Sequence, residues 1–507
     1  MSTTIAKVPA DYFEPPVTAA RRRLRRRHLV AAVTTAVVLV AAVGVAAVQY
    51  ADHLCRGFAR PDTRLTQVDG ECVGWTIEQA YPFTGQLAPV TTRIAEQNVS
   101  ARKRAEAEKR GYVRIAVLMP MTAGPASAMT MEHIRRGLEG VYVAQVRANS
   151  GVAGTASPYV QLVLMNEGRD QSHWPDLIPV LRELKTGDHP VVSVVGLGVS
   201  IPPTQAVAAE LSGIDLPAVG GVLTATDLNA PRLFEVSPSN EQYVNALADY
   251  RRRHPQLKEA LLVYDTNDDN YVRTLRVAFQ EQFKPFIKGR QKGFIGSLGT
   301  TDAQAAVFDA IKNTVCASKV DMVLYAGRDR DLPTLIDQLA ARSECYRRPP
   351  VDALDILTGS TGLNLDKTVE QKMVDGRITL IDASSSDPVT WQTGVDAPAG
   401  FKGFHAEFIK AFPATDLLDG YALGHHDAVA LVVEAIRNFA EQSPGSVVAG
   451  KDVHNQIINL NEADHPFQAA GGDLIFDDEI GRWPHGKKIA LIQLPAGRPP
   501  LPSFTTP

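Results

Sequence analysis

The sequence predicts an α/β protein with more than one parallel β-sheet, and three observations support that prediction. From residue 113 onward, short apolar runs alternate with longer amphipathic segments. The short runs are continuously apolar, which is typical of strands that helices cover on both faces of a sheet. The chain also has 507 residues, more than one ordinary domain needs and suitable for two or three.

The strands and helices are expected to alternate along the chain. We expect strands over residues 113–119, 159–166, 191–197, 218–220, 233–236, 260–264, 322–325 and 355–357. We expect helices over residues 131–149, 175–185, 204–212 and 241–254. Helices between strands supply the crossovers that a parallel sheet requires.

The composition excludes several classes of protein. The chain is 45% hydrophobic with 17 Phe, so it can bury a core and is neither disordered nor fibrous. Its net charge of −4 is unevenly distributed: residues 1–28 carry a net +5 and the remainder a net −9. A uniformly basic nucleic-acid binder is therefore not expected, and we predict no nucleic-acid partner.

A membrane signal lies where the charge changes sign. A run of six arginines within residues 21–27 precedes residues 29–48, which contain no charged side chain. Twenty helical residues span about 30 Å, the thickness of a bilayer core. We predict a cytoplasmic tail (1–28), a single transmembrane anchor (29–48) and an extracytoplasmic remainder at the cell membrane. A cleaved signal peptide is the alternative, but its apolar region is usually shorter.

Four cysteines follow the predicted anchor. Outside the cytoplasm we expect disulfides, with Cys55 paired to Cys72 and Cys316 paired to Cys345, although four cysteines allow three connectivities. A metal site is the less favoured alternative, because no Cys-x-x-Cys spacing occurs. Residues 49–110, which include the first two cysteines and a polar helix over 87–110, are expected to form a membrane-proximal stalk.

Three loops at predicted strand ends are candidates for ligand binding, because ligands of open parallel sheets lie beyond the carboxyl ends of the strands. The first contains Gly198, Ser200 and Pro202; Ser200 is expected to cap a helix whose N-terminal N–H groups could hold an anion. The second is the small, hydroxyl-rich stretch 220–227. The third is 265–271, which lacks the Gly and Glu of a calcium loop and ends in Tyr271, a possible ligand-facing aromatic.

Catalytic signatures are weak. The sequence around Ser200 lacks the last Gly of a nucleophile elbow, and there is no phosphate-binding loop or His-Glu-x-x-His pair. The sequence His425-His426-Asp427 could suggest a metal, but adjacent helical residues point about 100° apart, which favours surface histidines. We predict no enzyme activity, no catalytic residue, no cofactor and no metal site.

Five segments in order resemble the type I periplasmic-binding-protein fold, especially the branched-chain amino-acid-type substrate-binding proteins of ABC transporters. These are the loop through Gly198 and Ser200, the stretch 215–218 followed by 224–226, the segment 233–239, the helix from Tyr421, and the hairpin 471–486. The resemblance covers about residues 112–495 and would describe a membrane-anchored form of such a protein.

The resemblance implies a two-lobed ligand-binding domain over 111–507 that closes on a small molecule. Lobe one would comprise about 111–237 and 385–460, and lobe two about 238–384 and 461–507. The family pattern would place a ligand carboxylate at Ser200, Thr224, Ala225 and Thr226. From lobe two, Tyr271, Tyr325 and Gly327 would face that ligand.

One departure from the family concerns Thr361. It stands in the sequence Gly359-Ser360-Thr361-Gly362, where relatives that hold amino acids carry a Glu that pairs with the α-ammonium group. Burying an ammonium without a carboxylate is costly. A standard α-amino acid is therefore not the expected ligand, unless Asp265 or Asp329 substitutes.

The resemblance implies a solute-binding protein that delivers a small, polar, carboxylate-bearing ligand to an ABC-type importer through a membrane permease. The alternative is a ligand-sensing or interaction module of the same fold, partnered with a sensor subunit instead.

Overall fold

The computed structural model describes residues 63–150, 157–297, 304–342, 352–363, 365–461, 466–476, 483–497 and 500–506, and residues 28, 30, 31, 33–35 and 55. Residues 1–58 and 59–507 form two separate compact units. Among the described residues, no helix is both long enough and apolar enough to cross a membrane. Most of the predicted anchor, 29–48, lies outside the described residues.

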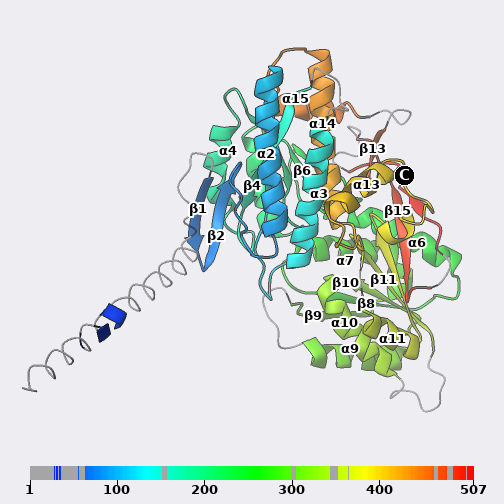
Figure 1. Ribbon diagram of the computed structural model, residues 1–507. Helices are drawn as coiled ribbons and strands as arrows, with labels where there is room; N and C mark the ends of the chain where they lie inside the picture. Colours follow the sequence, from blue (N-terminus) through cyan, green and yellow to red (C-terminus); the bar gives the residue numbers. More distant parts are fainter. Residues whose placement is uncertain are drawn as a thin grey trace, which may run out of the picture. The chain divides into compact units, whose positions relative to one another are not determined.

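The second unit contains two mixed sheets, each the centre of one lobe (Figure 1). The first sheet has the strand order β1-β2-β4-β3-β5-β6-β7. The bounds of its strands are β1 Thr63–Val68, β2 Glu71–Thr76, β3 Tyr112–Met119, β4 Tyr159–Asn166, β5 Val191–Gly196, β6 Ala218–Gly220 and β7 Leu233–Glu235. Its helices are α2 Ala88–Glu108, α3 Met131–Asn149, α4 Ile178–Leu184, α5 Pro202–Gly213, α12 Pro388–Trp391, α13 Phe401–Ala411, α14 Tyr421–Gln442 and α15 Gly450–Ile458.

The second sheet has the order β16-β15-β12-β11-β10-β8-β9. Its strands are β8 Ala260–Asp265, β9 Gln291–Phe294, β10 Met322–Ala326, β11 Leu354–Ser360, β12 Ile378–Ser384, β15 Lys488–Leu494 and β16 Phe504–Thr505. Its helices are α6 Asn240–Arg253, α7 Asn270–Gln282, α8 Lys284–Ile287, α9 Gln304–Ser318, α10 Leu332–Ala340 and α11 Lys367–Asp375. In both sheets the central strands are parallel and antiparallel strands lie at one edge.

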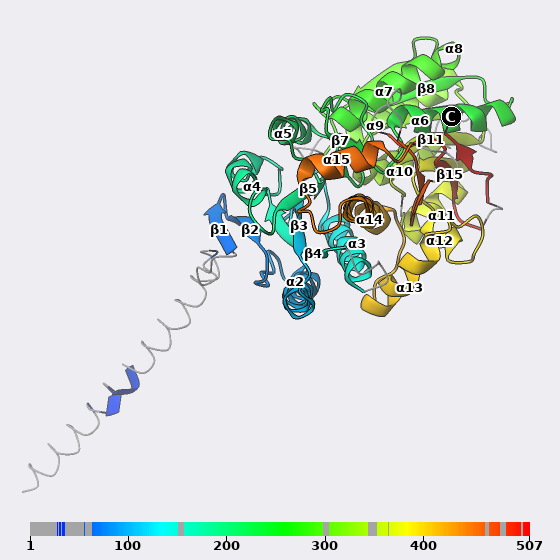
Figure 2. The same ribbon diagram turned by 90° about the horizontal axis from the view of Figure 1, so that it is seen from above.

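Successive residues of the central strands enter different cores, which explains their continuously apolar sequences. In β3, Ile115 and Val117 pack against α2, α3 and α14, whereas Ala116 and Leu118 pack against α4 and α5. Figure 2 shows these helices on the two sides of the first sheet. The second sheet is likewise covered by α9–α11 on one face and α6–α8 on the other. The predicted α/β architecture with parallel strands covered on both faces is confirmed.

Local capping determines where the helices that approach the second lobe begin. Ser239 accepts a hydrogen bond from the backbone N–H of Gln242, and the Gln242 side chain accepts one from the N–H of Ser239, which together form a capping box at α6. Asp269 caps α7 by accepting from the N–H of Val272 at 3.2 Å. Helix α6 thus begins shortly after β7, where the chain passes from the first sheet to the second, and α7 begins shortly after β8 of the second sheet.

The predicted stalk differs from the structure. Strand β2 pairs antiparallel with β4, so β1 and β2 extend the first sheet. Helix α2 packs against β4 through Asn98, a fully buried side chain that donates to the backbone oxygens of Ile77 (2.7 Å) and Leu162 (2.8 Å). Residues 63–110 are therefore part of lobe one and not a separate stalk. The hairpin of β13 (Phe467–Ala469) and β14 (Gly472–Leu474) also packs on α14 of lobe one, although 461–507 was assigned to lobe two.

The cysteines that the structure describes are oxidised. Cys55, Cys72 and Cys316 are each disulfide-bonded, and Cys345 lies outside the described residues. The pairing of Cys55 with Cys72 and of Cys316 with Cys345 stays a prediction.

Candidate functional site

A cavity of about 40 Å³ lies between the two lobes, where loops at the carboxyl ends of both sheets meet. Its lining residues come from the segments after β5, β6, β8, β10 and β11 and from the first turn of α14. They are Val199, Ser200, Val222, Thr224, Tyr271, Arg328, Asp329, Ser360, Thr361, Gly362 and Tyr421. The structure thus brings together four of the residues expected at the site: Ser200, Thr224, Tyr271 and Thr361.

Ser200 organises the lobe-one side of this cavity. Its Oγ accepts hydrogen bonds from the backbone N–H groups of Thr224 (3.1 Å) and Ala225 (3.3 Å). The prediction that Ser200 caps α5 was wrong: Ile201 occupies the cap position and provides no side-chain hydrogen bond. The backbone N–H groups on this side of the cavity are therefore those of Thr224 and Ala225, and both donate to the Ser200 hydroxyl.

Tyr271 forms the opposite wall. Its backbone N–H donates to the Ser200 carbonyl across the lobes at 3.1 Å, and its hydroxyl donates to the Gly359 carbonyl at 2.6 Å. Burial raises the pKa of Tyr271 well above its usual value, so the hydroxyl stays protonated. The side chain is a fixed hydrogen-bonding wall of the cavity.

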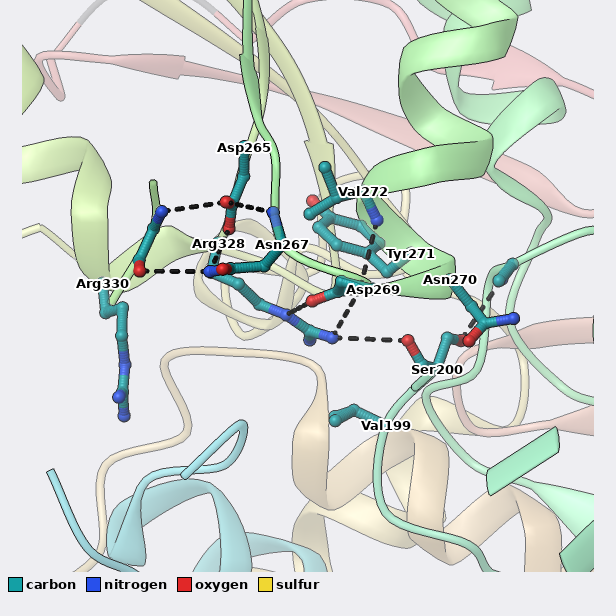
Figure 3. A network of polar contacts seen from close by, with 12 residues as sticks. Val199, Ser200, Asp265, Asn267, Asp269, Asn270, Tyr271, Val272, Arg328 and Arg330 are labelled. Atoms are coloured by element: carbon teal, nitrogen blue, oxygen red, sulfur yellow. Dashed lines mark hydrogen bonds and ion pairs between the residues drawn. The ribbon is translucent and has the colours of Figure 1, made fainter. Parts of the chain in front are cut away.

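A buried ion pair lies next to Tyr271 (Figure 3). The Arg328 guanidinium holds both carboxylate oxygens of Asp269, at 2.8 and 3.0 Å, and Asp269 has no exposed surface. The same guanidinium lies over the Tyr271 ring, 5.0 Å from its centroid, and donates to the Ser200 carbonyl at 3.4 Å. Arg328 thus links the ion pair of lobe two to the backbone of lobe one.

The sequence reasoning missed Arg328. Gly327-Arg328-Asp329 directly follows β10, so the strand-end rule that selected Ser200 could also have selected this arginine. Its partner Asp269 lies 59 residues away, and the sequence shows no sign of that pairing.

Several other expected site residues lie outside the lining of this cavity. Tyr325 is buried in the core of lobe two, and its hydroxyl donates to the Arg328 carbonyl at 2.8 Å. A Cβ at Gly327 would lie 2.6 Å from the Tyr325 hydroxyl, so this glycine makes room for that contact. Ala225 touches the site only through its N–H, and Thr226 does not line it.

The two aspartates considered as ammonium partners are placed differently. Asp265 accepts from the N–H groups of Asn267 (2.9 Å) and Gly296 (2.8 Å) and does not line the cavity. Asp329 does line it, with one carboxylate oxygen 3.7 Å from Nε2 of His133 in the other lobe. Of the two, only Asp329 is placed to meet a ligand.

Polar contacts around the cavity hold the lobes together. Asn270 donates to the side chains of Gln205 (3.1 Å) and Asp227 (2.9 Å), and Arg273 pairs with Asp227 at 2.8 Å. Arg330 donates to the Pro125 carbonyl at 2.6 Å.

The cavity between the lobes is small. A volume of about 40 Å³ admits only a few water molecules, whereas small-molecule sites measure about 300 Å³ or more. A ligand can therefore enter only if the lobes separate.

His425 and His426 are not surface residues. Both are buried in α14, with 0% and 1% of their surface exposed. Burial lowers the pKa of His425 to about 4, and this ring packs against Gly137 of α3. Among the described residues, no group of three or more side chains is arranged to hold a metal ion.

Asp382 provides a pH-dependent test of the site. It lies fully buried in β12 and accepts a hydrogen bond at 2.8 Å from Ser360, which lines the cavity. Burial raises the pKa of Asp382 from 3.8 to about 7, against the opposing effect of the Ser360 hydrogen bond. Because the folded-state pKa is raised, the folded protein loses stability as pH rises from about 4 to about 7.

We expect the Asp382→Asn variant to gain stability relative to the wild type over that interval, with the gain levelling off above pH 7. Denaturation midpoints at each pH from 4 to 8 measure the difference, and groups common to both proteins cancel. A difference that does not change with pH would contradict the assignment.

No family model matches the sequence, and no curated protein matches it. Solved structures do match. A leucine-binding protein from Thermotoga maritima superposes with a TM-score of 0.56 at 16% identity, covering 78% of this chain and 99% of that one. A branched-chain amino acid transporter substrate-binding protein from Streptococcus pneumoniae, solved with isoleucine, gives a TM-score of 0.54 at 16% identity over 75% and 95%.

A third match is a solute-binding protein of an ABC transporter from R. palustris in complex with 4-hydroxybenzoate, with a TM-score of 0.54 at 16% identity over 78% and 97% of the two chains. The chain has the type I periplasmic-binding-protein fold. At these identities the likeness establishes the fold, and the cavity between the lobes of this fold is the place to look for a ligand.

Proposed function

We propose that this protein is an extracytoplasmic solute-binding protein, anchored in the membrane by residues 29–48, that traps a small polar ligand between its lobes for an ABC-type importer. The observation that supports it best is the cavity between the lobes, which polar groups line from both sides. The similar structures are named as substrate-binding proteins and cover most of this chain. Their named ligands, isoleucine and 4-hydroxybenzoate, both carry a carboxylate.

The lobe-one groups suit a carboxylate. The N–H groups of Thr224 and Ala225 converge on one oxygen, that of Ser200. A ligand carboxylate next to Ser200 would compete for these donors, as an anion does at clustered backbone N–H groups. With Thr361 in place of a family glutamate, an acid without an α-ammonium group fits this site better than an amino acid, unless Asp329 accepts the ammonium.

A thermal-shift screen on the full-length chain tests the proposal. Amino acids, aromatic acids, sugars, amines and peptides are added separately, and unfolding is followed by intrinsic fluorescence. A ligand present at 100 times its Kd should stabilise the protein by about 2.7 kcal/mol. We expect the response from carboxylates and not from their amides.

The Tyr271→Phe variant should weaken that response, because it loses the hydroxyl that bonds to the Gly359 carbonyl. Ser212→Ala, on the far end of α5, is the matched control and should leave it unchanged. A screen in which no compound shifts the midpoint would count against the proposal.

A ligand-sensing module of the same fold is the second candidate. Direct contacts between the lobes support it, since Arg328 and the backbone N–H of Tyr271 both donate to the Ser200 carbonyl and so couple the lobes to one another. A sensor of this kind would signal through a membrane partner subunit. Pull-down from membranes distinguishes the two: a permease supports transport, and a kinase or other regulatory protein supports sensing.

A further inference from the structure

A second cavity, of about 460 Å³, lies in lobe one between α3, α13, α14 and β13. Figure 2 shows α3, α13 and α14 next to one another. Its volume is within the range of small-molecule sites, and its described lining shares no residue with the cavity between the lobes. It therefore needs an explanation of its own.

A buried chain of hydrogen bonds positions one cation in this cavity. Asp427 accepts from the backbone N–H groups of Ala470 (2.9 Å) and Gly471 (2.7 Å) and lies 2.8 Å from Nδ1 of His426. Nε2 of His426 lies 2.8 Å from Nη1 of Arg147. Arginine can only donate, so Nε2 accepts, and the ring proton is on Nδ1 and points to Asp427.

This arrangement uses only one N–H of the Arg147 guanidinium. Burial lowers the pKa of His426, which keeps the ring neutral and able to accept. Among the described residues, no carboxylate oxygen lies within 4.0 Å of the Arg147 guanidinium, and the group is half-buried. Arg147 is thus hydrogen-bonded to a neutral partner, and the carboxylates of Asp427 and Glu407 act on its charge only from beyond ion-pair distance.

Arg437 supplies a second cation to the same cavity. Within the part of the chain that the structure describes, its Nε is buried without a hydrogen-bond partner, and the nearest carboxylate oxygen, on Glu434, is 3.9 Å from Nη1. Burial lowers the pKa of Arg147 most; the charge of Asp427 raises it, that of Arg437 lowers it, and that of Glu407 raises it. An anion between the two half-buried guanidinium groups would compensate both positive charges, which a neutral hydrogen-bond acceptor would not do.

The rest of the lining is largely apolar or already neutralised. Lys410 at the rim is 74% exposed and pairs with Glu407 at 3.3 Å. Ala430, Val433 and Phe467 supply an apolar wall. The cavity therefore combines two guanidinium groups with a hydrocarbon surface.

We propose that this cavity is a second ligand site, which binds a small organic acid with its carboxylate at Arg147 and Arg437 and its apolar body against Val433 and Phe467. The site is independent of the cleft between the lobes and of the function proposed for that cleft.

Isothermal titration of the full-length chain with 4-phenylbutyrate tests the proposal, with 4-phenylbutanamide as the neutral compound of the same shape. We expect the acid to bind with a Kd below about 1 mM and the amide not to bind. Arg437→Gln should weaken binding of the acid at least about tenfold, since it removes a charge-assisted contact. Arg437 is partly exposed, with 28% of its side-chain surface accessible, so the fold should tolerate the change.

Two controls locate the binding. Ser212→Ala, on α5 and outside the lining of both cavities, should leave the affinity for the acid unchanged. Arg252→Gln, which removes an exposed cation from lobe two, should also have no effect. Absence of binding, equal binding of acid and amide, or an affinity that Arg437→Gln leaves unchanged would each overturn the proposal.

Discussion

Replacing Arg328 with methionine should destabilise the protein by about 3–5 kcal/mol, the usual cost of removing one partner from a buried ion pair. Asp269 has no exposed surface and would lose the guanidinium that holds both of its oxygens. The cross-lobe hydrogen bond to the Ser200 carbonyl would also be lost. Chemical denaturation of the two proteins measures the difference.

Two further variants separate this explanation from a general loss of packing. Adding Asp269→Asn to Arg328→Met should recover much of the loss, because asparagine removes the isolated charge and can still cap α7. Arg252→Met is the exposed control: its side chain is 69% accessible, and its partner Asp249 also pairs with Arg253. It should change stability by less than about 0.5 kcal/mol. Equal effects of Arg328→Met and Arg252→Met would refute the buried-pair explanation.

Substituting Gly140 with alanine should destabilise lobe one by at least about 1–3 kcal/mol through overpacking. A Cβ at this position of α3 would lie 2.0 Å from the Ala422 carbonyl oxygen of α14. The obstacle is backbone, so no side chain can rotate away from it. The helices would have to separate, and α14 also carries Tyr421 of the cleft and His426 of the second cavity.

Gly213→Ala is the matched control for this substitution. Gly213 is the last residue of α5, and a Cβ added there would meet no atom within 4 Å. Alanine there should be neutral or stabilise by up to about 1 kcal/mol, because it restricts the unfolded chain. Urea denaturation of both variants gives the comparison, and a tolerated Gly140→Ala would mean that the two helices can move apart freely.

The lobe-one cleft residues could be predicted because they follow a local rule. Ser200 and Thr224 come directly after short, continuously apolar strands, and the carboxyl ends of parallel strands lie at one edge of a sheet. Tyr271 and Thr361 were reached through the same rule together with the family resemblance. Tyr325 was misplaced because it still lies inside β10, where residues on both faces enter cores, and only residues beyond the end of that strand reach the cleft.

The lobe boundaries show where local patterns become insufficient. Strand β2 and helix α2 carry mixed, partly polar sequences that resemble a stalk. Only the pairing of β2 with β4, about 90 residues later, and the contact of Asn98 in α2 with β4, 64 residues later, make them part of a core. In the same way, the polar residue Asn98 is buried because backbone groups of β4 and of the segment after β2 satisfy it. Partners so far apart in the chain are not encoded by spacing.

The sequence by itself determined the α/β class, the order of the strands and helices between residues 113 and 264, and the loops that could meet a ligand, because periodicity and strand-end position are properties of short segments. Only the tertiary structure decided that Arg328 meets Asp269, that Arg147 and Arg437 share a cavity, and that the cleft is closed to about 40 Å³. Ion pairs and cavities depend on distances between segments that are remote in the chain, and those distances exist only once the sheets and helices have packed.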